Sequence, residues 1–337
     1  MSVEIIAEIG VNHNADLELA FCMIEKAAKS GADIIKFQTA IPELVQTANA
    51  PMADYQVKNT GKKVSQLEMS KKLHFPLEIF STLKSEVESY GKVFMSTAFD
   101  LVSLDLFTDL GEKTFKIPSG ELTNLPYLRK IGSKANKVFM STGMATYSEV
   151  EDALQVILNC GLEKKQVTIL QCNTEYPTPF EDVNLRAMVS MGEKLNVKFG
   201  YSDHTPGVEA SIAAVALGAS VIEKHFTIDK ELKGPDQKAS LNPIEFESLV
   251  NGIRNVEKAL GGNLKKPSPS EIENKTLTRR SVYTSKKISK GEIISLDNLA
   301  VLRPENGFSP MRIDELIGKK AVRQMSPQFK ISLNDVE

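Results

Sequence analysis

Eight short hydrophobic runs, rich in β-branched and aromatic residues, recur along the first part of the chain. They occupy residues 5–9, 34–38, 93–97, 114–117, 138–141, 168–171, 198–201 and 221–225. Segments with apolar residues at helical spacing lie between them, at residues 17–30, 76–90, 147–159, 207–217 and 243–260. Alternating strands and helices predict a parallel sheet, either a barrel or an open doubly wound sheet. Eight such units favour a (β/α)8 TIM barrel.

Two segments interrupt this repeat. Residues 40–73 are too long for a plain turn, so we expect an active-site loop with some helix of its own. Residues 261–270 combine glycine, proline, serine and lysine, which is typical of an exposed linker. We therefore expect a catalytic barrel over residues 1–262, a linker over 263–277 and a second module over 278–337. A module of that size buries little core alone and should pack against another surface.

Composition narrows the class of protein. The chain is 42% hydrophobic with a net charge of −2, and no apolar stretch approaches the roughly 20 residues that cross a bilayer. Lysines and arginines are scattered, which argues against a nucleic-acid or membrane surface. The first residues, MSVEIIAEIG, lack the features of a secretory signal, so we expect a cytoplasmic protein. Cys22, Cys160 and Cys172 form no CxxC pair, and we interpret all three as small buried hydrophobic residues.

The polar residues that follow the strands carry the candidate chemistry, because a TIM barrel has its active site at the carboxyl ends of its strands. His204 and His225 follow predicted strands seven and eight, which are neighbours in a barrel. Alone, each histidine is best explained as a buried residue bonded to the backbone. As a pair in a chain with four histidines, they favour a divalent-cation site completed by water and substrate oxygens.

A second group of residues suits an anion. Lys36 and Lys116 lie inside apolar strands, where an unpaired ammonium is costly. Hydroxyl side chains follow the neighbouring strands, at Thr97, Ser119, Ser141 and Thr142. Each of these is usually a turn or cap residue, but their repetition beside Gly120 and Gly143 predicts a site for a small carboxylate or phosphate.

Four carboxylates are candidate acids and bases: Glu8, Glu121, Asp203 and Asp236. For Glu8 and Asp203, a salt bridge to a neighbouring lysine is an equally good explanation. Glu121, in KIPSGE, lies just past the anion donors and is the preferred candidate for proton transfer.

Several segments together resemble the bacterial sialic acid synthase family, which comprises N-acetylneuraminate synthases and their legionaminate and pseudaminate relatives. The resemblance spans nearly the whole chain and rests on AEIGVNHN, IKFQT, FKIPSGE, STGMAT, QCNTEYPTPFEDVNL, GYSDHTPG, EKHFT and GPDQKAS. The tail, RRSVYTSKKISKGEIISLDNLAVLRPENG, resembles the antifreeze-like SAF domain that follows the barrel in this family.

The resemblance implies a transferase that condenses phosphoenolpyruvate with an N-acetylmannosamine-type sugar. It implies Mn²⁺, or another divalent cation such as Mg²⁺ or Co²⁺, at His204 and His225, with Glu8 and Lys116 among the catalytic residues. The phosphoenolpyruvate site would comprise Lys36, Thr97, Lys116, Ser119, Ser141 and Ser202, and the sugar site Gln38, Asn59, Tyr176 and Asp236. It also implies a domain-swapped homodimer, in which Arg303 of LRPENG reaches the partner's sugar.

Alternatives remain open at this point. N-acetylneuraminate synthesis from N-acetylmannosamine is the favoured activity, and the first alternative is legionaminic acid synthesis from 2,4-diacetamido-2,4,6-trideoxymannose, with pseudaminic acid synthesis less favoured. A few side-chain changes separate such acceptors. A carbohydrate- or anion-binding protein on a retired barrel and a metal-dependent aldolase acting on pyruvate are the remaining possibilities.

Overall fold

The computed structural model describes residues 2–337. The chain divides into two compact units, Met1–Gly261 and Gly262–Glu337. No helix in the described part of the chain is both long enough and apolar enough to span a bilayer.

Eight parallel strands form the interior of the first unit. They are β1 (Glu4–Gly10), β2 (Ile34–Thr39), β3 (Val93–Ala98), β4 (Thr114–Ile117), β5 (Lys137–Ser141), β6 (Val167–Cys172), β7 (Lys198–Asp203) and β8 (Val221–His225). Their order is β3-β2-β1-β8-β7-β6-β5-β4, and the end strands β3 and β4 also contact each other. The sheet therefore curls into a nearly closed barrel, which confirms the predicted fold class.

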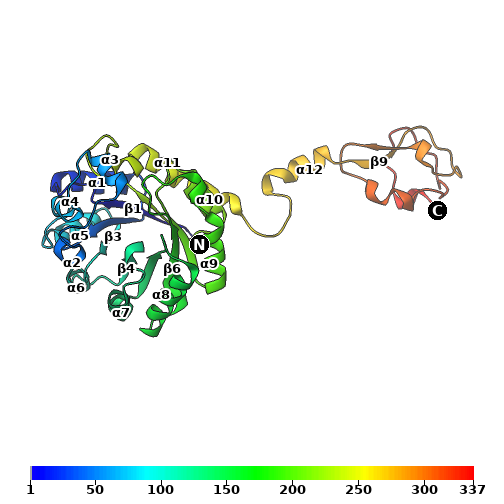
Figure 1. Ribbon diagram of the computed structural model, residues 1–337. Helices are drawn as coiled ribbons and strands as arrows, with labels where there is room; N and C mark the ends of the chain where they lie inside the picture. Colours follow the sequence, from blue (N-terminus) through cyan, green and yellow to red (C-terminus); the bar gives the residue numbers. More distant parts are fainter. Residues whose placement is uncertain (1) are drawn as a thin grey trace. The chain divides into compact units, whose positions relative to one another are not determined.

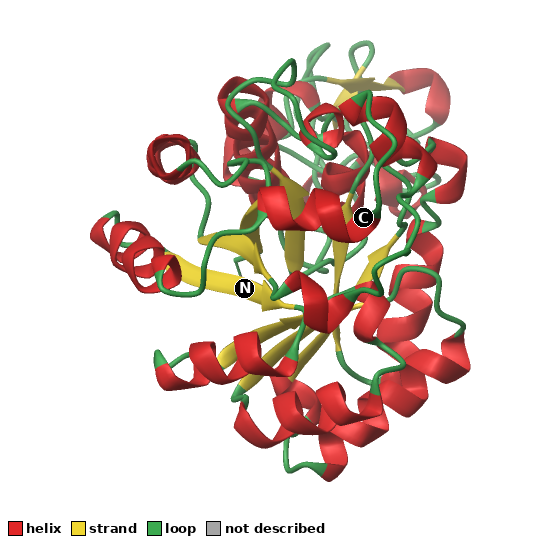
Figure 2. Cartoon of the chain, turned by 60° about the vertical axis from the view of Figure 1, so that its left-hand side comes forward, coloured by secondary structure: helices red, strands yellow, loops and turns green. Residues whose placement is uncertain are grey.

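Helices surround the strands on the outside (Figures 1 and 2). The barrel unit contains α1 (Leu17–Lys29), α2 (Pro42–Val45), α3 (Asp54–Thr60), α4 (Gln66–Leu73), α5 (Ile79–Ser89), α6 (Leu101–Asp109), α7 (Leu125–Lys134), α8 (Tyr147–Asn159), α9 (Leu185–Leu195), α10 (Glu209–Ala216) and α11 (Pro243–Leu260). Three of these, α2 to α4, lie within residues 40–73 of the long β2 to β3 connection, where a loop with some helix was predicted.

Side chains of the strands point alternately outward to the helices and inward to the barrel axis. One inward layer is an apolar cluster of Ile6, Ile34, Met95, Phe139, Leu170 and Val221. Two residues later on the same strands come Glu8, Lys36, Thr97, Ser141, Cys172 and Glu223. The period of two thus places a polar layer directly above an apolar one, and the apolar layer closes the barrel beneath it.

Helix starts follow local capping chemistry. Asp16 accepts a hydrogen bond from the Leu19 amide at the start of α1, and Asp100 accepts from Val102 and Ser103 at the start of α6. His13 lies just before the Asp16 cap and has a different role. Its ring is buried and stacks on Phe75 with the ring centroids 4.2 Å apart, and burial lowers its pKa to about 3.

The second unit has a small core of its own. Helix α12 (Ile272–Thr278) precedes the antiparallel strands β9 (Ser281–Thr284) and β10 (Leu299–Leu302), and isolated bridges connect the rest of the unit. Its buried apolar residues are Val282, Ile288, Ile294, Leu299, Leu316, Ala321, Met325, Ile331 and Val336. The segment expected to be a linker is irregular only in its first part, since α12 begins at Ile272.

Gly200 lies in the apolar layer of β7, and we expect Gly200→Ala to destabilise the barrel. An added Cβ would lie 2.4 Å from the carbonyl oxygen of Val221 and 2.8 Å from Cδ2 of Leu170, so β7 and β8 would have to separate. Overpacking of this kind costs about 1–3 kcal/mol in the free energy of unfolding. Urea denaturation measures it.

Gly120→Ala is the matched control for this substitution. A Cβ added at Gly120 would meet nothing within 4 Å. The free energy of unfolding of the Gly120→Ala variant should therefore stay near that of the unmodified chain. Equal stability of the two variants would contradict the close contact at Gly200.

Candidate active site

A cavity of about 170 Å³ lies above the apolar layer, toward the carboxyl ends of the strands. All eight strands contribute to its wall: Glu8 from β1, Lys36 and Gln38 from β2, Thr97 from β3, Lys116 from β4, Ser141 from β5, Cys172 from β6, Ser202 from β7, and Glu223 and His225 from β8. Ser119, Thr174, Tyr176 and His204 complete its polar lining from the following loops. Residues far apart in the sequence therefore meet at one point.

A buried network of two lysines and two carboxylates occupies the cavity wall. Lys36 Nζ lies 2.5 Å from Glu8 Oε2 and 3.6 Å from Glu223 Oε1, and Lys116 Nζ lies 2.8 Å from that same Glu223 oxygen. All four side chains are at most 5% exposed. Such charges require close pairing, because burial removes their hydration. The register Glu8↔Lys36 between β1 and β2 brings the first pair together.

The two carboxylates differ in their protonation. Burial raises the pKa of Glu8 to about 7, although Lys36 opposes the shift. Burial also acts to raise the pKa of Glu223, but Lys116 and Lys36 outweigh it and lower that pKa to about 2. For Lys36, burial opposes protonation, but Glu223 and Glu8 raise its pKa. Near neutral pH, Glu223 therefore stays ionised, whereas Glu8 exchanges its proton.

Hydroxyl groups surround the lysines. Thr97 Oγ1 accepts a hydrogen bond of 3.1 Å from Lys36, and Ser202 donates one of 3.1 Å to Glu223. Ser119 Oγ accepts from the Gly143 amide at 2.9 Å, an approach that a Cβ at residue 143 would obstruct. Ser141 Oγ is buried without a hydrogen-bond partner. The predicted anion residues thus come together, except for Thr142, whose hydroxyl donates to the Leu170 carbonyl.

His204 and His225 lie side by side in the wall, with ring centroids 5.4 Å apart. Nδ1 of His204 lies 2.6 Å from the carbonyl oxygen of Asn173, which leaves Nε2 for another partner. Metal-binding histidines commonly donate their second N–H to a backbone carbonyl in this way. Burial, followed by the charge of His204, lowers the pKa of His225 well below its usual value, which favours the neutral, metal-binding form.

These two imidazoles fit a divalent cation that also takes ligands from water or substrate. Within residues 2–337, no group of three or more histidine, cysteine, aspartate or glutamate side chains is arranged to hold a metal. A metal held here would therefore keep open positions, as catalytic metal sites do. Burial disfavours protonation of His204, but Cys172 and the Asn173 carbonyl outweigh it and raise the pKa of that histidine.

Several predicted residues of the barrel unit do not line the cavity. The carboxylate of Glu121 accepts a 2.6 Å hydrogen bond from the Asn124 side chain, and Asn124 caps α7. Glu121 therefore supports a helix start, and it is not among the residues that line the cavity. Asn59 donates to the carbonyl of Pro235. Arg303 is exposed in the second unit.

Asp203 also faces away from the cavity. It pairs with Lys224 at 2.9 Å and accepts hydrogen bonds from Thr205 and Ser211. All of these side chains are buried, so Asp203 belongs to the structural network that holds β7 and β8 together. The salt-bridge explanation for this carboxylate is therefore correct.

Glu223 and Cys172 are cavity residues to which the sequence assigned no role. Glu223 is the shared partner of both lysines, and its position two residues before His225 is the signal that places it on the same face of β8. Cys172 Sγ lies 3.9 Å from Nδ1 of His204, so this thiol is part of the site. Cys22 and Cys160 are only partly buried, so the prediction of three buried cysteines is wrong for them.

A second cavity, of about 250 Å³, adjoins the first. Gln38, Phe99 and Tyr176 line both, and Asp236 lines the second. Tyr176 connects the two, because its ring stacks on His204 at 4.0 Å and on Tyr55 at 5.1 Å. Burial raises the pKa of Asp236 to about 6.

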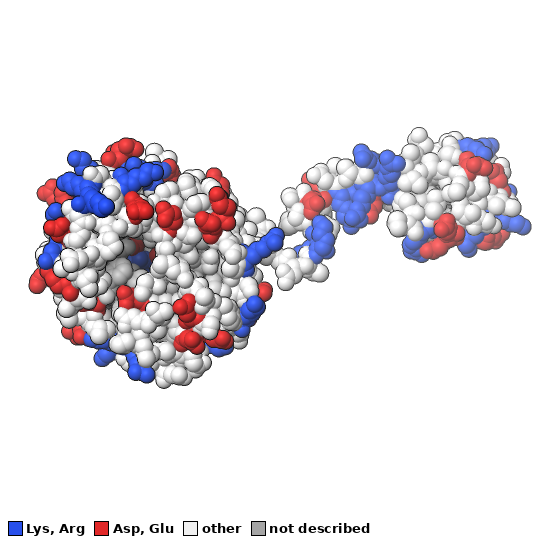
Figure 3. Space-filling model, in the orientation of Figure 1, with Lys and Arg blue, Asp and Glu red and all other residues white. Residues whose placement is uncertain are grey.

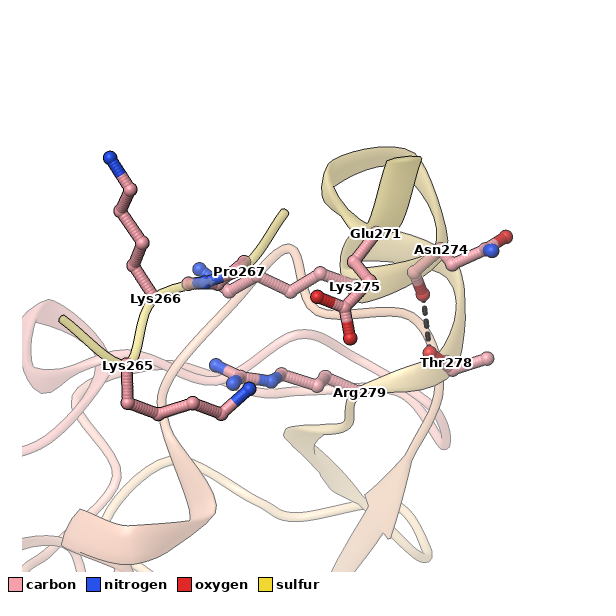
Figure 4. A pocket seen from close by; sticks show the side chains of 8 residues that line it. All are labelled: Lys265, Lys266, Pro267, Glu271, Asn274, Lys275, Thr278 and Arg279. Atoms are coloured by element: carbon pink, nitrogen blue, oxygen red, sulfur yellow. Dashed lines mark hydrogen bonds between the residues drawn. The ribbon is translucent and has the colours of Figure 1, made fainter. Parts of the chain in front are cut away.

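A third cavity, of about 520 Å³, lies in the second unit and has a different character. Lys265, Lys266, Lys275 and Arg279 line it together with Glu271 (Figure 4). Basic side chains gather over this segment, whereas acidic and basic residues are mixed over the barrel unit (Figure 3). Positive charge is therefore more clustered here than the sequence indicated. Lys265, Lys266, Glu271 and Arg279 are exposed and Lys275 is partly buried, so water solvates these charges and no fully buried side chain is among them.

Comparison with known proteins gives consistent matches. Residues 23–265 match the NeuB family, and residues 279–336 match the SAF domain. The chain is 50% identical to N,N'-diacetyllegionaminic acid synthase of Campylobacter jejuni over 95% of this chain and 96% of the relative. It is 41% identical to the enzyme of that name from Legionella pneumophila, over 97% and 92%.

A solved structure shares the fold. The N-acetylneuraminic acid synthetase of Leptospira borgpetersenii, in complex with citrate, superposes with a TM-score of 0.70 and 32% identity. The match covers 81% of this chain and 90% of the other.

We expect Glu223→Gln to destabilise the barrel strongly, because it leaves Lys36 and Lys116 with one carboxylate between them. Removing one partner of a buried ion pair costs about 3–5 kcal/mol. The measurement is the free energy of unfolding in urea.

Glu163→Gln is the control for the loss of a carboxylate, since Glu163 pairs with Lys165 on the barrel surface, where both side chains are more than 60% exposed. That variant should lose less than about 1 kcal/mol. Equal losses in both variants would show that the buried network does not hold the site together.

Proposed function

The chain belongs to the NeuB family, and we propose that it condenses phosphoenolpyruvate with an open-chain N-acetylated amino sugar, forming a nine-carbon 2-keto acid and phosphate. The observation that carries this proposal is the convergence of Lys36, Lys116 and the hydroxyls of Thr97, Ser119, Ser141 and Ser202 beside two histidines in one cavity. A compact anion and a polarised carbonyl compound can meet there.

The lysines and hydroxyls would bind phosphoenolpyruvate. Lys36 and Lys116 supply positive charge, and Ser141 offers a buried hydroxyl that lacks any other partner. Backbone and side-chain donors that are already oriented need little reorganisation when charge develops. Glu8 and Glu223 hold the two ammonium groups in place before the anion arrives.

His204 and His225 would hold a divalent cation, for which we propose Mn²⁺ or a comparable ion such as Mg²⁺ or Co²⁺. When bound, the ion would act as a Lewis acid on the carbonyl oxygen of the open-chain sugar. Tyr176, stacked on His204, would limit the positions available to the sugar.

The bond changes follow from the two substrates. C3 of phosphoenolpyruvate forms a carbon–carbon bond to C1 of the sugar, whose carbonyl oxygen takes a proton. Water adds to C2. The bond between C2 and the oxygen that bridges to phosphorus then breaks, and phosphate departs with that oxygen. Lys36 and Lys116 would offset the charge of the departing phosphate, and Glu8, which lines the cavity, would move the protons in place of Glu121.

For the acceptor, we propose 2,4-diacetamido-2,4,6-trideoxymannose, which gives N,N'-diacetyllegionaminate. The relative that shares 50% identity across almost the whole chain is named for that product. N-acetylmannosamine, the acceptor favoured from sequence motifs, gives N-acetylneuraminate and is the competing choice. We further propose a homodimer in which Arg303 of one chain reaches the sugar in the partner's barrel.

Phosphate release tests the proposed reaction. The purified chain should release phosphate when phosphoenolpyruvate, Mn²⁺ and the acceptor sugar are all present, and mass spectrometry should find the 2-keto acid in equal amount. Omitting the sugar should abolish release. Product formation from pyruvate without phosphoenolpyruvate would establish an aldolase instead, and sugar binding without turnover would indicate a binding protein.

Glu8→Gln should lower kcat by about 10²-fold or more, the usual contribution of a positioned acid or base. Glu121→Gln is the matched control and should retain most of the activity, because its carboxylate contacts Asn124 outside the cavity. Steady-state kinetics on folded variants measure both. If Glu121→Gln lost activity and Glu8→Gln did not, proton transfer would have to be assigned to Glu121 and not to Glu8.

A further inference from the structure

The second cavity is walled by the α2 to α4 segment and by the rim of the barrel. Its lining includes Val45 and Gln46, Tyr55 and Gln56, and then Gln66, Met69, Ser70, Leu73 and His74 from this segment. Gln38, Phe99, Tyr176 and Asp236 line it from the barrel side. Because Gln38 and Tyr176 also line the reaction cavity, a substrate held beside the two histidines can extend into this space.

Three side chains in this wall hold polar atoms that have no hydrogen-bond partner. Oε1 of Gln46, Oε1 of Gln66 and Nε2 of His74 are all buried and unpaired. The Gln46 amide donates to Ser70 Oγ at 3.1 Å, so its oxygen half is the free one, and exchanging the two halves would still leave one unpaired. Leaving a buried polar group without a partner costs about 1–3 kcal/mol, so a ligand that supplies the partner is favoured.

The free atoms are acceptors. His74 Nδ1 lies 3.0 Å from the Ser70 carbonyl and therefore carries the proton, which leaves Nε2 as an acceptor. Burial lowers the pKa of His74, so the neutral form is retained. A rotation about the last torsion of a glutamine, which is broad, turns its oxygen toward a ligand. The wall therefore suits a ligand with N–H or O–H donors.

Apolar side chains lie between these acceptors. Met69 is buried, Val45 and Leu73 are partly buried, and all three line the same cavity. A hydroxyl placed against them would lose its hydration, whereas a methyl group would not. Methionine also adapts its shape to an irregular neighbour. The cavity thus combines amide-type recognition with methyl-sized apolar surface.

We propose that this second cavity is the subsite that selects the acceptor sugar, through its C4 acetamido group and its C6 methyl group. The acetamido N–H donates to Gln46 or Gln66, and the methyl groups contact Met69 and Leu73. N-acetylmannosamine carries hydroxyls at C4 and C6, so it gains less from this wall. The inference rests on the proposed synthase function and assigns Gln46, Gln66 and Met69 as its specificity-determining residues.

The test compares kcat/KM for 2,4-diacetamido-2,4,6-trideoxymannose and N-acetylmannosamine, with phosphoenolpyruvate and Mn²⁺ saturating. The unmodified chain should prefer the diacetamido sugar. Gln46→Met and Gln66→Met keep length but remove the amide, and the variant that loses the acceptor of the acetamido N–H should reduce that preference about tenfold, the value of one neutral hydrogen bond. Met69→Gln should reduce it as well, while the KM for phosphoenolpyruvate should not change.

Gln155→Met is the matched control, because Gln155 is exposed on α8 and its amide contacts only Asn159 in the described structure. It should leave the preference unchanged. A measurement on the unmodified chain removes any dependence on folding of the variants: 2-acetamido-2,6-dideoxymannose, which differs from N-acetylmannosamine only in the C6 methyl, should be the better substrate of the two.

The possible results separate the two proposals. No phosphate release with any of these sugars would overturn the synthase function itself. Turnover with a preference for N-acetylmannosamine, or with a preference that none of the three variants changes, would leave the synthase function intact and overturn the assignment of this subsite.

Discussion

The buried network of Glu8, Lys36, Glu223 and Lys116 is the constraint on which the rest of the site depends. Two ammonium groups inside a barrel are tolerable only if carboxylates pair with them closely. Glu223 meets this need for both lysines at once, with one oxygen contacting Lys116 at 2.8 Å and Lys36 at 3.6 Å. The same pairing fixes where positive charge lies, so a bound anion finds its donors already oriented.

The barrel supplies this network through a simple geometric rule. Side chains on each strand point alternately into and out of the barrel. The apolar residues Ile6, Ile34 and Val221 therefore come two positions before Glu8, Lys36 and Glu223 on the same strands. Because inward-facing residues recur at every second position, each of these strands places a polar residue after its apolar one, toward the carboxyl end of the barrel. The apolar layer excludes water from below, which strengthens the charge interactions above it.

The groups proposed for chemistry and for specificity occupy different parts of the structure. Most of the groups proposed to react come from the strands, whose positions are set by the sheet. The second cavity is walled by α2 to α4, which lie in one long connection of the chain. Such connections can change without disturbing the strands. Relatives that share this barrel and carry the names of different sugar acids are consistent with this division.

By itself the sequence determined the eight strands, five of the helical segments between them and the list of strand-end residues, because period-two and helical patterns are local properties. It also placed Lys36, Lys116, His204 and His225 in one site once parallel strands were assumed. Only the tertiary structure decided which carboxylates face inward. Glu121 and Glu8 look alike in sequence, yet one supports the Asn124 cap and the other pairs with Lys36. Side-chain direction after a strand depends on the path of the loop and on partners distant in sequence. Only the tertiary structure shows the two lysines that Glu223 pairs with, and the lack of a partner for the buried oxygens of Gln46 and Gln66.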